Sequence, residues 1–325
     1  MPLVSIIVPA FDAEPFIAAT LASASAQTLR DIEIIVVDDV SHDRTPEIVA
    51  AAAVQDPRIR LIRQPRNGGP SVARNTGIAA ATGTWIALLD ADDRYEPDRL
   101  ERMVACAERH DADLVSDNLL LVPEERPDDT RPMIPPAILD SERTLGIAEF
   151  VRRNIADPEA PDANYGFLKP LMRRAFLAEH AIRYDESVRF AEDFALYAHC
   201  LRAGARWWMM PQPLYRYLVR KNGLTQVQTV HDLGKLRSVQ RVMLDEASRA
   251  ADAGLVRLIR QHMRVVDRCY HYRAFTDDLK ARRFGPAMRR VLAGPRTAGL
   301  IAEESLRQVP IIAAKALRGG YRSHG

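Results

Sequence analysis

The sequence predicts an α/β fold with a mostly parallel central sheet, followed by a helical extension. Over roughly the first hundred residues, short apolar and β-branched runs alternate with segments of helical periodicity. The apolar runs are continuous rather than alternating, which is typical of strands covered by helices on both faces of a sheet. From about Asp232 the pattern is almost wholly helical, with Arg and Lys between apolar positions. We therefore expect two domains, residues 1–229 and 230–325.

The first four strands and the helices between them follow in order along the chain. Strands are expected at 4–9, 32–37, 59–62 and 85–89, and helices at 14–26, 45–53 and 71–81. Asp43 or Thr45 is suited to cap the second helix. Ligands bind at the carboxyl ends of strands in such sheets. The polar residues that follow Val8, Val37 and Leu89 are therefore expected to form the functional site.

The second half of the first domain is less regular. We expect a helix at 94–110, strands at 114–121, 166–172 and 206–210, and a loop rich in Pro and charge at 123–136.

Composition indicates an ordinary globular protein. Apolar residues make up 47% of the 325 and charged residues 27%, enough to bury a full core. No apolar run reaches the roughly 18 residues of a spanning helix, and the N-terminus has no signal-peptide pattern. Cys106, Cys200 and Cys269 lie far apart, which argues against a disulfide framework and against a zinc site. We expect a cytoplasmic protein.

The charge is unevenly distributed along the chain. Residues 230–325 hold 19 Lys and Arg against 9 Asp and Glu, whereas the first 229 hold 26 against 34. Arg257, Arg260, Arg264 and Arg268 recur at helical spacing. They form either solvated helix faces or a surface for anionic lipid headgroups at the cytoplasmic face of the inner membrane. The acidic first domain and the lack of a known motif argue against nucleic-acid binding.

Three carboxylates follow directly on the fourth expected strand. Asp90, Asp92 and Asp93 are crowded there, and crowded like charges need a compensating cation or other partner. Carboxylate oxygens suit Mg²⁺ or Mn²⁺, which also bridge diphosphates. The alternative is an acidic turn that caps the next helix.

Polar and aromatic residues also follow the first and second strands. Asp39 stands at the end of the second strand, where it can accept hydrogen bonds from a base N–H or from ribose hydroxyls. Phe11, after the first strand, can stack on a nucleobase with Asp12 beside it. A simple core aromatic is the alternative interpretation of Phe11.

A glycine-bearing loop at 66–69 opens the third helix. Glycines allow close backbone approach, and a helix N-terminus favours anions. Arg74 on this helix can reach a phosphate or order the acidic cluster. The loop is not a GxxxxGK[ST] sequence, and GxGxxG is absent from the chain, which argues against P-loop and dinucleotide-binding proteins.

These four segments, in this order and spacing, resemble the GT-A-fold family 2 glycosyltransferases. The resemblance is strong over residues 2 to about 100 and continues more weakly to about 225. It implies that Pro9, Phe11 and Asp39 hold the nucleobase, with Asp39 accepting a hydrogen bond from it. Asp12, beside them in the donor site, replaces the Asn usual at its position.

The resemblance also implies a metal and a base. Asp90 would lie by the ribose, and Asp92, with Asp90 beside it, would bind the Mn²⁺ or Mg²⁺ that bridges the two phosphates. The segment 190–194 resembles the family's Glu-Asp motif, so Asp193 would be the catalytic base and Glu192 would orient the acceptor or the helix start. Without the resemblance, these two acidic residues would be an ordinary helix N-terminus.

Two further segments bear on the substrates. Residues 165–170 resemble a segment of transferases that build bacterial exopolysaccharide repeat units, such as those for succinoglycan. Lys169 within it faces either a phosphate or solvent. At 217–225 many relatives carry a loop that closes on the diphosphate, and here Arg220 or Lys221 can supply the charge. The Gln-x-x-Arg-Trp motif of processive relatives is absent from the sequence, which favours single addition.

The expected function is inverting, metal-dependent transfer of a sugar from a nucleotide diphosphate donor. The first candidate for the donor is a UDP-hexose. The acceptor would be a hydroxyl of a saccharide or lipid-linked saccharide. Two alternatives remain. A nucleotidyltransferase on a similar fold would need a Gly-rich basic loop after the first strand, which residues 11–15 do not provide. A non-catalytic nucleotide-sugar-binding or scaffold protein is disfavoured because the acidic cluster and the base are both present.

Overall fold

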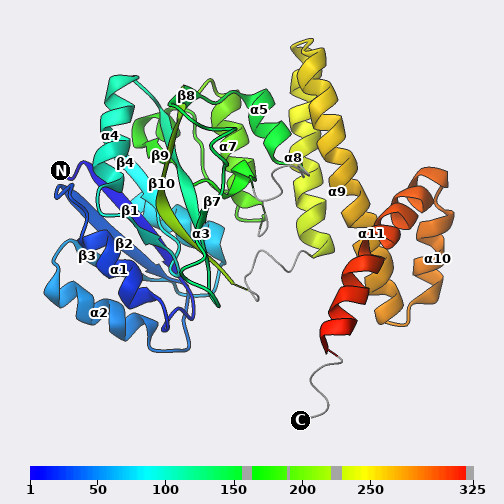
Figure 1. Ribbon diagram of the computed structural model, residues 1–325, viewed down its shortest axis with the longest axis horizontal. Helices are drawn as coiled ribbons and strands as arrows, with labels where there is room; N and C mark the ends of the chain where they lie inside the picture. Colours follow the sequence, from blue (N-terminus) through cyan, green and yellow to red (C-terminus); the bar gives the residue numbers. More distant parts are fainter. Residues whose placement is uncertain (156–162, 189–190, 221–228, 320–325) are drawn as a thin grey trace. The chain divides into compact units, whose positions relative to one another are not determined.

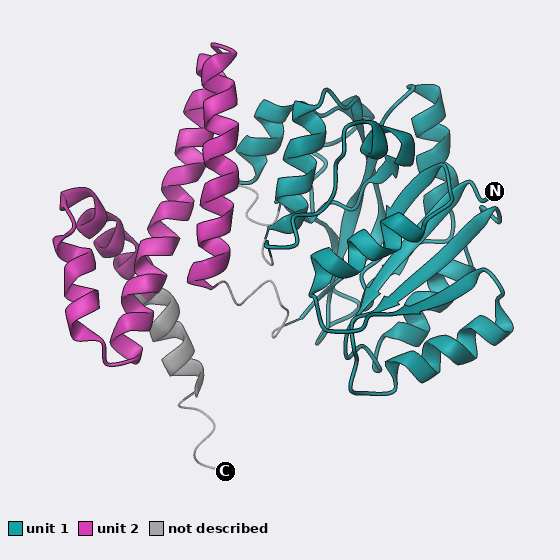
Figure 2. Ribbon diagram, turned by 180° about the vertical axis from the view of Figure 1, so that it is seen from behind, with its two compact units in different colours: residues 1–226 teal, residues 227–325 magenta. Residues whose placement is uncertain are grey.

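The computed structural model describes residues 1–155, 163–188, 191–220 and 229–319, and the side chains of the last helix as far as residue 308. The chain divides into two compact units, Met1–Gln226 and Val227–Gly325 (Figure 2). The domain boundary expected after residue 229 lies near this division. In the described residues the first unit mixes strands and helices, whereas the second is wholly helical.

One mixed sheet runs through the first unit (Figure 1). Its strands are β1 (Val4–Ala10), β2 (Ile32–Asp38), β3 (Ile59–Arg63), β4 (Trp85–Leu88), β5 (Arg94–Tyr95), β6 (Leu114–Pro123), β7 (Arg131–Pro132), β8 (Arg143–Thr144), β9 (Leu171–Arg173) and β10 (Trp207–Val219). The order is β3-β2-β1-β4-β9-β6-β10-β5, with β7 beside β6 and β8 beside β10. The long pairs β1–β2, β2–β3, β1–β4 and β6–β10 are parallel, and the short strands pair antiparallel. The expected mostly parallel sheet is confirmed.

Helices cover both faces of this sheet. They are α1 (Ile17–Ser25), α2 (Thr45–Gln55), α3 (Pro70–Ala80), α4 (Arg99–Arg109), α5 (Ile147–Arg153), α6 (Arg174–Glu179) and α7 (Glu192–Arg202). The helices α1 and α2 lead from β1 to β2 and on to β3, and α3 returns to β4 on the other side of β1. Because crossovers between parallel strands are right-handed, α1 and α2 lie on one face and α3 on the other.

The central strands are buried on both faces, as their continuous apolar runs predicted. Ile6, Ile7 and Val8 of β1 are fully buried. The helix α3 approaches this strand closely at Gly77, where an added Cβ would lie 2.3 Å from Cγ2 of Ile7. Glycine at this position therefore allows the helix to pack against the strand.

The carboxylate of Asp43 accepts a hydrogen bond from the backbone N–H of Thr45, the first residue of α2, at 3.0 Å.

Several expected elements differ in the second half of the unit. The helix expected from residue 94 begins at Arg99, because 94–95 pair with β10 as strand β5. The strand expected at 166–172 is a 3₁₀ turn, η1 (Tyr165–Phe167), followed by β9. Asn164 accepts the N–H of Gly166 and so favours the turn over a strand. The strand expected at 206–210 extends to Val219, and the expected loop at 123–136 includes β7.

The second unit consists of α8 (Val230–Arg249), α9 (Ala253–Lys280), α10 (Phe284–Leu292) and α11 (Pro295–Gly319). The expected helical extension is therefore confirmed. The first helix begins with a capping box, in which Thr229 accepts the N–H of Asp232 and the Asp232 carboxylate accepts the N–H of Thr229. The helices α8, α10 and α11 all contact α9. No helix in the described part of the chain has the length and apolarity needed to span a bilayer.

The arginine stripe expected on the extension is not a continuous cationic face. Arg268 is buried and donates to Glu304 at 2.6 Å and to Glu303 at 3.0 Å. Arg264 lies 3.4 Å from the same Glu303. The charges of these two arginines are thus used to join α9 to α11, which a helical spacing pattern in one segment does not reveal.

Candidate active site

The strands β1, β2 and β4 are parallel neighbours, so their carboxyl ends meet at one edge of the sheet. Phe11 and Asp12 follow β1, Asp39 follows β2, and the acidic cluster at 90–93 follows β4. Residues that are far apart in the sequence are therefore gathered at this edge, as the strand order requires.

Asp39 is held by the glycine-bearing loop. Its two carboxylate oxygens accept the N–H groups of Gly68 at 2.8 Å and Gly69 at 2.7 Å. Gly69 has a positive φ of 83°, a conformation that glycine adopts readily, and it directly precedes α3. Asp39 is 3% exposed. A carboxylate has about four lone-pair positions, and these two N–H groups occupy two of them.

Phe11 is an exposed side chain at this edge. It is 45% exposed and its ring meets His42 edge-on, with the centroids 5.7 Å apart. The alternative of a core aromatic is therefore wrong. Asp12, which has a positive φ of 45°, accepts the N–H of His42 at 2.7 Å. This contact ties the end of β1 to the turn after β2. Pro9 lies within β1 beside Val37.

Two buried cations hold three carboxylates together. Arg74, from α3, donates to Asp90 at 2.9 Å and to Glu192 at 2.7 Å. Lys169 donates to Asp193 at 2.7 Å, and its Nζ lies 3.1 Å from Asp90. The side chains of Arg74 and Lys169 are only 5% and 4% exposed. Of the two alternatives for Lys169, the position in solvent is therefore wrong. Arg74 lies within the acidic cluster.

This pairing sets the charge state of the cluster. Burial opposes the charge of Asp90, but Lys169 and Arg74 hold the pKa of its carboxyl well below the usual range. Burial likewise opposes the charge of both cations, yet the carboxylates raise the pKa of each well above its usual value. For Glu192, burial prevails and raises the pKa. Asp90 is therefore an anion near neutral pH, and the two cations keep their protons.

Asp92 is the carboxylate of the cluster best suited to a cation. Its side chain is 31% exposed, and burial followed by the charge of Asp90 raises its pKa. Arg220 donates to one oxygen at 3.1 Å and lies over the ring of Phe16. Both oxygens of Asp90 face cations, whereas Asp92 has donor capacity left for a hard divalent ion. Lys221, the other charge expected near the diphosphate, lies outside the described residues.

Asp93 plays a structural part in the same segment. It is 2% exposed and accepts the hydroxyl of Tyr215 and the N–H of Leu218, both at 2.7 Å. The Tyr215 hydroxyl also accepts the N–H of Asp90 at 3.1 Å. Hydrogen bonds from Tyr215 and Leu218 of strand β10 therefore hold the acidic turn in place.

Sequence reasoning missed the side chains that support the site. Tyr184 donates to Asp193 at 2.8 Å. Arg99 and Asp117 form a fully buried ion pair at 2.8 Å, and Arg99 also donates to the backbone oxygen of Lys169 at 2.6 Å. The only sequence signal for the pair is the charged Asp117 within the apolar strand β6, and this does not identify its partner.

A mostly parallel sheet of this order, with an acidic cluster at the carboxyl ends of its strands, defines a GT-A fold. Residues 5–177 match the family model described as glycosyl transferase family 2, and the chain belongs to this family. Two similar relatives come from Rhizobium meliloti (strain 1021). The succinoglycan biosynthesis protein ExoO is 34% identical over 91% of this chain and 82% of its own. The corresponding protein ExoU is 32% identical over 94% and 89%.

Solved structures share the fold. S. aureus TarS 1-349 in complex with UDP-GlcNAc has a TM-score of 0.66 at 18% identity, covering 95% of this chain and 92% of that one. The mannosyltransferase PcManGT from Pyrobaculum calidifontis, in complex with GDP-Man and Mn²⁺, has a TM-score of 0.57 at 19% identity, covering 95% and 81%. At these identities the likeness establishes the fold.

Proposed function

We propose that this protein is an inverting, metal-dependent glycosyltransferase of bacterial polysaccharide biosynthesis. It transfers a hexose from a nucleotide diphosphate donor to a hydroxyl of a saccharide or lipid-linked saccharide and releases the nucleoside diphosphate. A UDP-hexose is the first candidate for the donor. The observation that carries the proposal is the cluster in which Arg74 and Lys169 hold Asp90, Glu192 and Asp193 together beside Asp92. This cluster brings a candidate base and a candidate metal ligand to one edge of the sheet.

The donor site lies over the ends of β1 and β2. Phe11 offers an exposed ring for stacking, and Asp39 keeps lone pairs for a base N–H. Pro9 and Asp12 complete the wall beside them. A UDP-sugar is the expected donor, and the complex of the TarS neighbour with UDP-GlcNAc supports this choice.

Asp92 would hold the divalent cation, with Asp90 beside it. The exposed oxygen-donor capacity of Asp92 fits Mn²⁺ or Mg²⁺, and the Mn²⁺ in the PcManGT complex supports the assignment. When bound, such an ion neutralises charge on a diphosphate leaving group. Arg220 pairs with Asp92 in this structure, and we expect it to turn to the diphosphate when the donor binds.

Asp193 would act as the base. The acceptor hydroxyl attacks the anomeric carbon from the face opposite the diphosphate, and its proton passes to a carboxylate oxygen of Asp193. Lys169 and the Tyr184 hydroxyl each hold one of the two oxygens and fix the orientation of the group. Glu192, anchored by Arg74, would orient the acceptor. The two alternatives, a nucleotidyltransferase and a non-catalytic binding protein, assign no role to this base.

We propose further that the helical unit contacts an anionic membrane at the cytoplasmic face, where a lipid-linked acceptor would lie. Phe284, Met288 and Leu292 recur every four residues on α10 and are 66%, 57% and 75% exposed. They therefore form one apolar helix face. Arg289 follows Met288 on this exposed surface, and Arg282 precedes the helix. Exposed apolar side chains bordered by arginine suit an anionic lipid surface.

The proposal is tested by calorimetric titration of UDP into the full chain, first with Mn²⁺ and then with EDTA. Binding that requires the metal supports the donor and metal assignments. Release of UDP from UDP-glucose that depends on an added saccharide acceptor would extend them to transfer. Absence of binding with UDP, GDP and dTDP alike would contradict the proposal and favour the non-catalytic alternative.

A further inference from the structure

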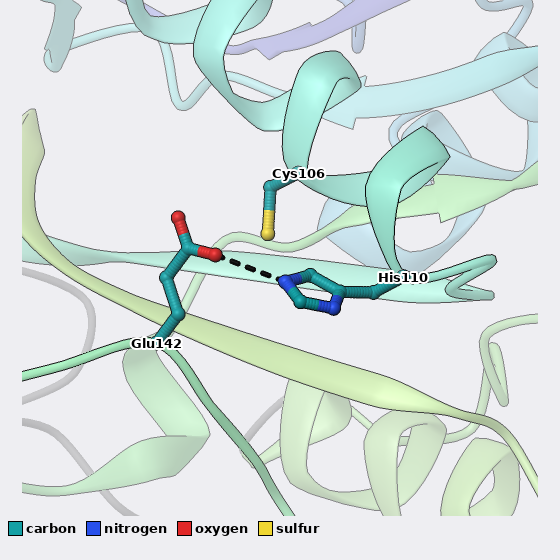
Figure 3. Close-up of side chains that lie close together, drawn as sticks. All are labelled: Cys106, His110 and Glu142. Atoms are coloured by element: carbon teal, nitrogen blue, oxygen red, sulfur yellow. Dashed lines mark hydrogen bonds and ion pairs between the residues drawn. The ribbon is translucent and has the colours of Figure 1, made fainter.

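A second group of metal-ligating side chains lies at the other end of α4. Cys106, His110 and Glu142 each offer one ligand atom, and these atoms all lie within 4.8 Å of one another. Figure 3 shows the three side chains converging, two from α4 and its end and one from the segment before β8. Among the residues that the structure describes, no other group of three or more His, Cys, Asp or Glu side chains has its ligand atoms this close together.

This group is separate from the acidic cluster. Arg99, the first residue of α4, contacts the backbone of Lys169 at the active site. A helix rises about 1.5 Å per residue, so Cys106 and His110 lie roughly 10 and 16 Å further along the axis. His110 comes just before β6, at the amino end of that strand. The group therefore lies towards the opposite edge of the sheet from the carboxylates.

The sequence spacing places two of the ligands on one side of the helix. Cys106 and His110 are four residues apart, and the N–H of His110 donates to the backbone oxygen of Cys106 at 3.2 Å, which continues the helical turn. The imidazole is held flat against Trp208, with ring centroids 3.6 Å apart and an angle of 10°. This stacking fixes the plane of the ring and directs Nε2 towards Glu142, 3.0 Å away.

Glu142 is also oriented by a neighbour. Arg109 donates to its Oε2 at 2.7 Å. Hydrogen bonds of this kind hold ligating carboxylates in place around metal ions. Cys106 itself is fully buried. A metal ion binds the thiolate form of cysteine, so binding would release the thiol proton.

We propose that Cys106, His110 and Glu142 form a binding site for a thiophilic divalent ion, and Zn²⁺ is the first candidate. One thiolate, one neutral imidazole and one carboxylate carry two negative charges, which the ion balances. Neighbouring ligands of a tetrahedral zinc ion are roughly 3.3–3.8 Å apart, so the side chains need to close by about 1 Å. The fourth position is left for water. The ion would join the segment before β8 to α4 and so stabilise the unit.

The test uses Co²⁺, which replaces Zn²⁺ and reports its ligands by absorption. Titration of the full chain with Co²⁺ alone is expected to give one equivalent with a thiolate-to-cobalt charge-transfer band. A cobalt ion on the oxygens of Asp92 gives no such band, so the two sites are distinguishable. Zn²⁺ added afterwards should abolish the band and raise the Tm by several degrees.

Three variants decide the assignment. Cys106→Ser should lose the band, whereas Cys200→Ser, which changes another buried cysteine, should keep it. Glu142→Gln retains the thiol and should weaken Co²⁺ binding at least tenfold, which covers the case in which Cys106→Ser fails to fold. A wild-type protein without the band, or a band that persists in Cys106→Ser, would overturn the proposal.

Discussion

Lys169 and Asp193 form a buried ion pair, with 2.7 Å between Nζ and Oδ2. Lys169 lies just before β9, whereas Asp193 lies in the first turn of α7. The lysine side chain is 4% exposed and the aspartate side chain 11%. A carboxylate held this firmly has one orientation, which is what a base that accepts a proton from an oriented hydroxyl requires.

The first prediction concerns that base. Asp193→Asn keeps the size of the side chain and can still accept the Tyr184 hydroxyl, but it removes the basic oxygen. Transfer should fall by about 10²–10⁴-fold while UDP affinity changes little. Single-turnover assays with a radiolabelled UDP-sugar measure the first quantity and calorimetry the second. Glu192→Gln is the matched comparison and should mainly raise the KM for acceptor. Loss of turnover in Glu192→Gln alone would make Glu192 the base.

The second prediction concerns the metal. Asp92→Ala removes the exposed carboxylate of the acidic turn but leaves Asp90 paired with Arg74 and Lys169. UDP affinity in the presence of Mn²⁺ should therefore drop at least tenfold, to the value measured with EDTA. The exposed Asp31→Ala serves as the control and should bind as the wild type does. Unchanged Mn²⁺-dependent affinity in Asp92→Ala would move the metal to other residues.

The first four strands were predictable because their signal is local. A strand buried on both faces reads as a continuous apolar run, and β1, β2 and β4 are such strands. The half-exposed strand β3 was indicated by its short run of branched apolar residues. The short strands were not predictable. Arg94 and Tyr95 pair with β10 more than a hundred residues later, and nothing in their own sequence distinguishes them from the start of a helix. Pairing between distant segments decided these elements.

The site was predictable where it depends on strand ends and not where it depends on pairing. The positions of Asp39 and Asp92 at one edge of the sheet could be predicted because polar residues that follow neighbouring parallel strands gather there. The burial of Lys169 arises from its contacts with Asp90 and Asp193, which only the folded chain brings together. The spacing of the cysteines argued against a zinc site because it compares only cysteines with one another. Folding brings Cys106 close to His110 and Glu142, which that spacing does not reveal.

The third prediction concerns stability beneath the site. Asp117→Asn leaves the Arg99 guanidinium charged in a fully buried position without its anion. The free energy of unfolding should decrease by about 3–5 kcal/mol, which urea denaturation measures. Replacing both partners by apolar residues, Arg99→Met with Asp117→Leu, should recover part of this loss because no buried charge remains. A single variant as stable as the wild type would show that water reaches Arg99.

The fourth prediction concerns the apolar face of α10. Changing Phe284, Met288 and Leu292 together to Ser should reduce binding to vesicles that contain phosphatidylglycerol at least tenfold in a flotation assay. The double change of the exposed Val54 and Val242 to Ser is the control, because it removes apolar surface from other helices. The double variant Arg282→Ala, Arg289→Ala should bind anionic vesicles more weakly. Its binding should also depend less on the salt concentration. Equal flotation of all variants would leave this face without a lipid role.

The fifth prediction concerns acid stability of the helical unit. Burial of His262 in α9 lowers the pKa of its imidazole to about 4, whereas in an unfolded chain it is about 6.5. The folded state thus favours the neutral ring, and between these two values the unfolded chain binds the additional proton. Stability should therefore fall as the pH decreases from about 6.5 to 4, by roughly 3 kcal/mol from this residue. Calorimetric unfolding at several pH values measures the loss.

The variant His262→Gln should reduce the slope of the free energy of unfolding against pH, whereas His231→Gln, which changes an exposed histidine, should not. An NMR titration that places the His262 pKa near 6.5 would refute the argument, since burial would then impose no cost on its charged form.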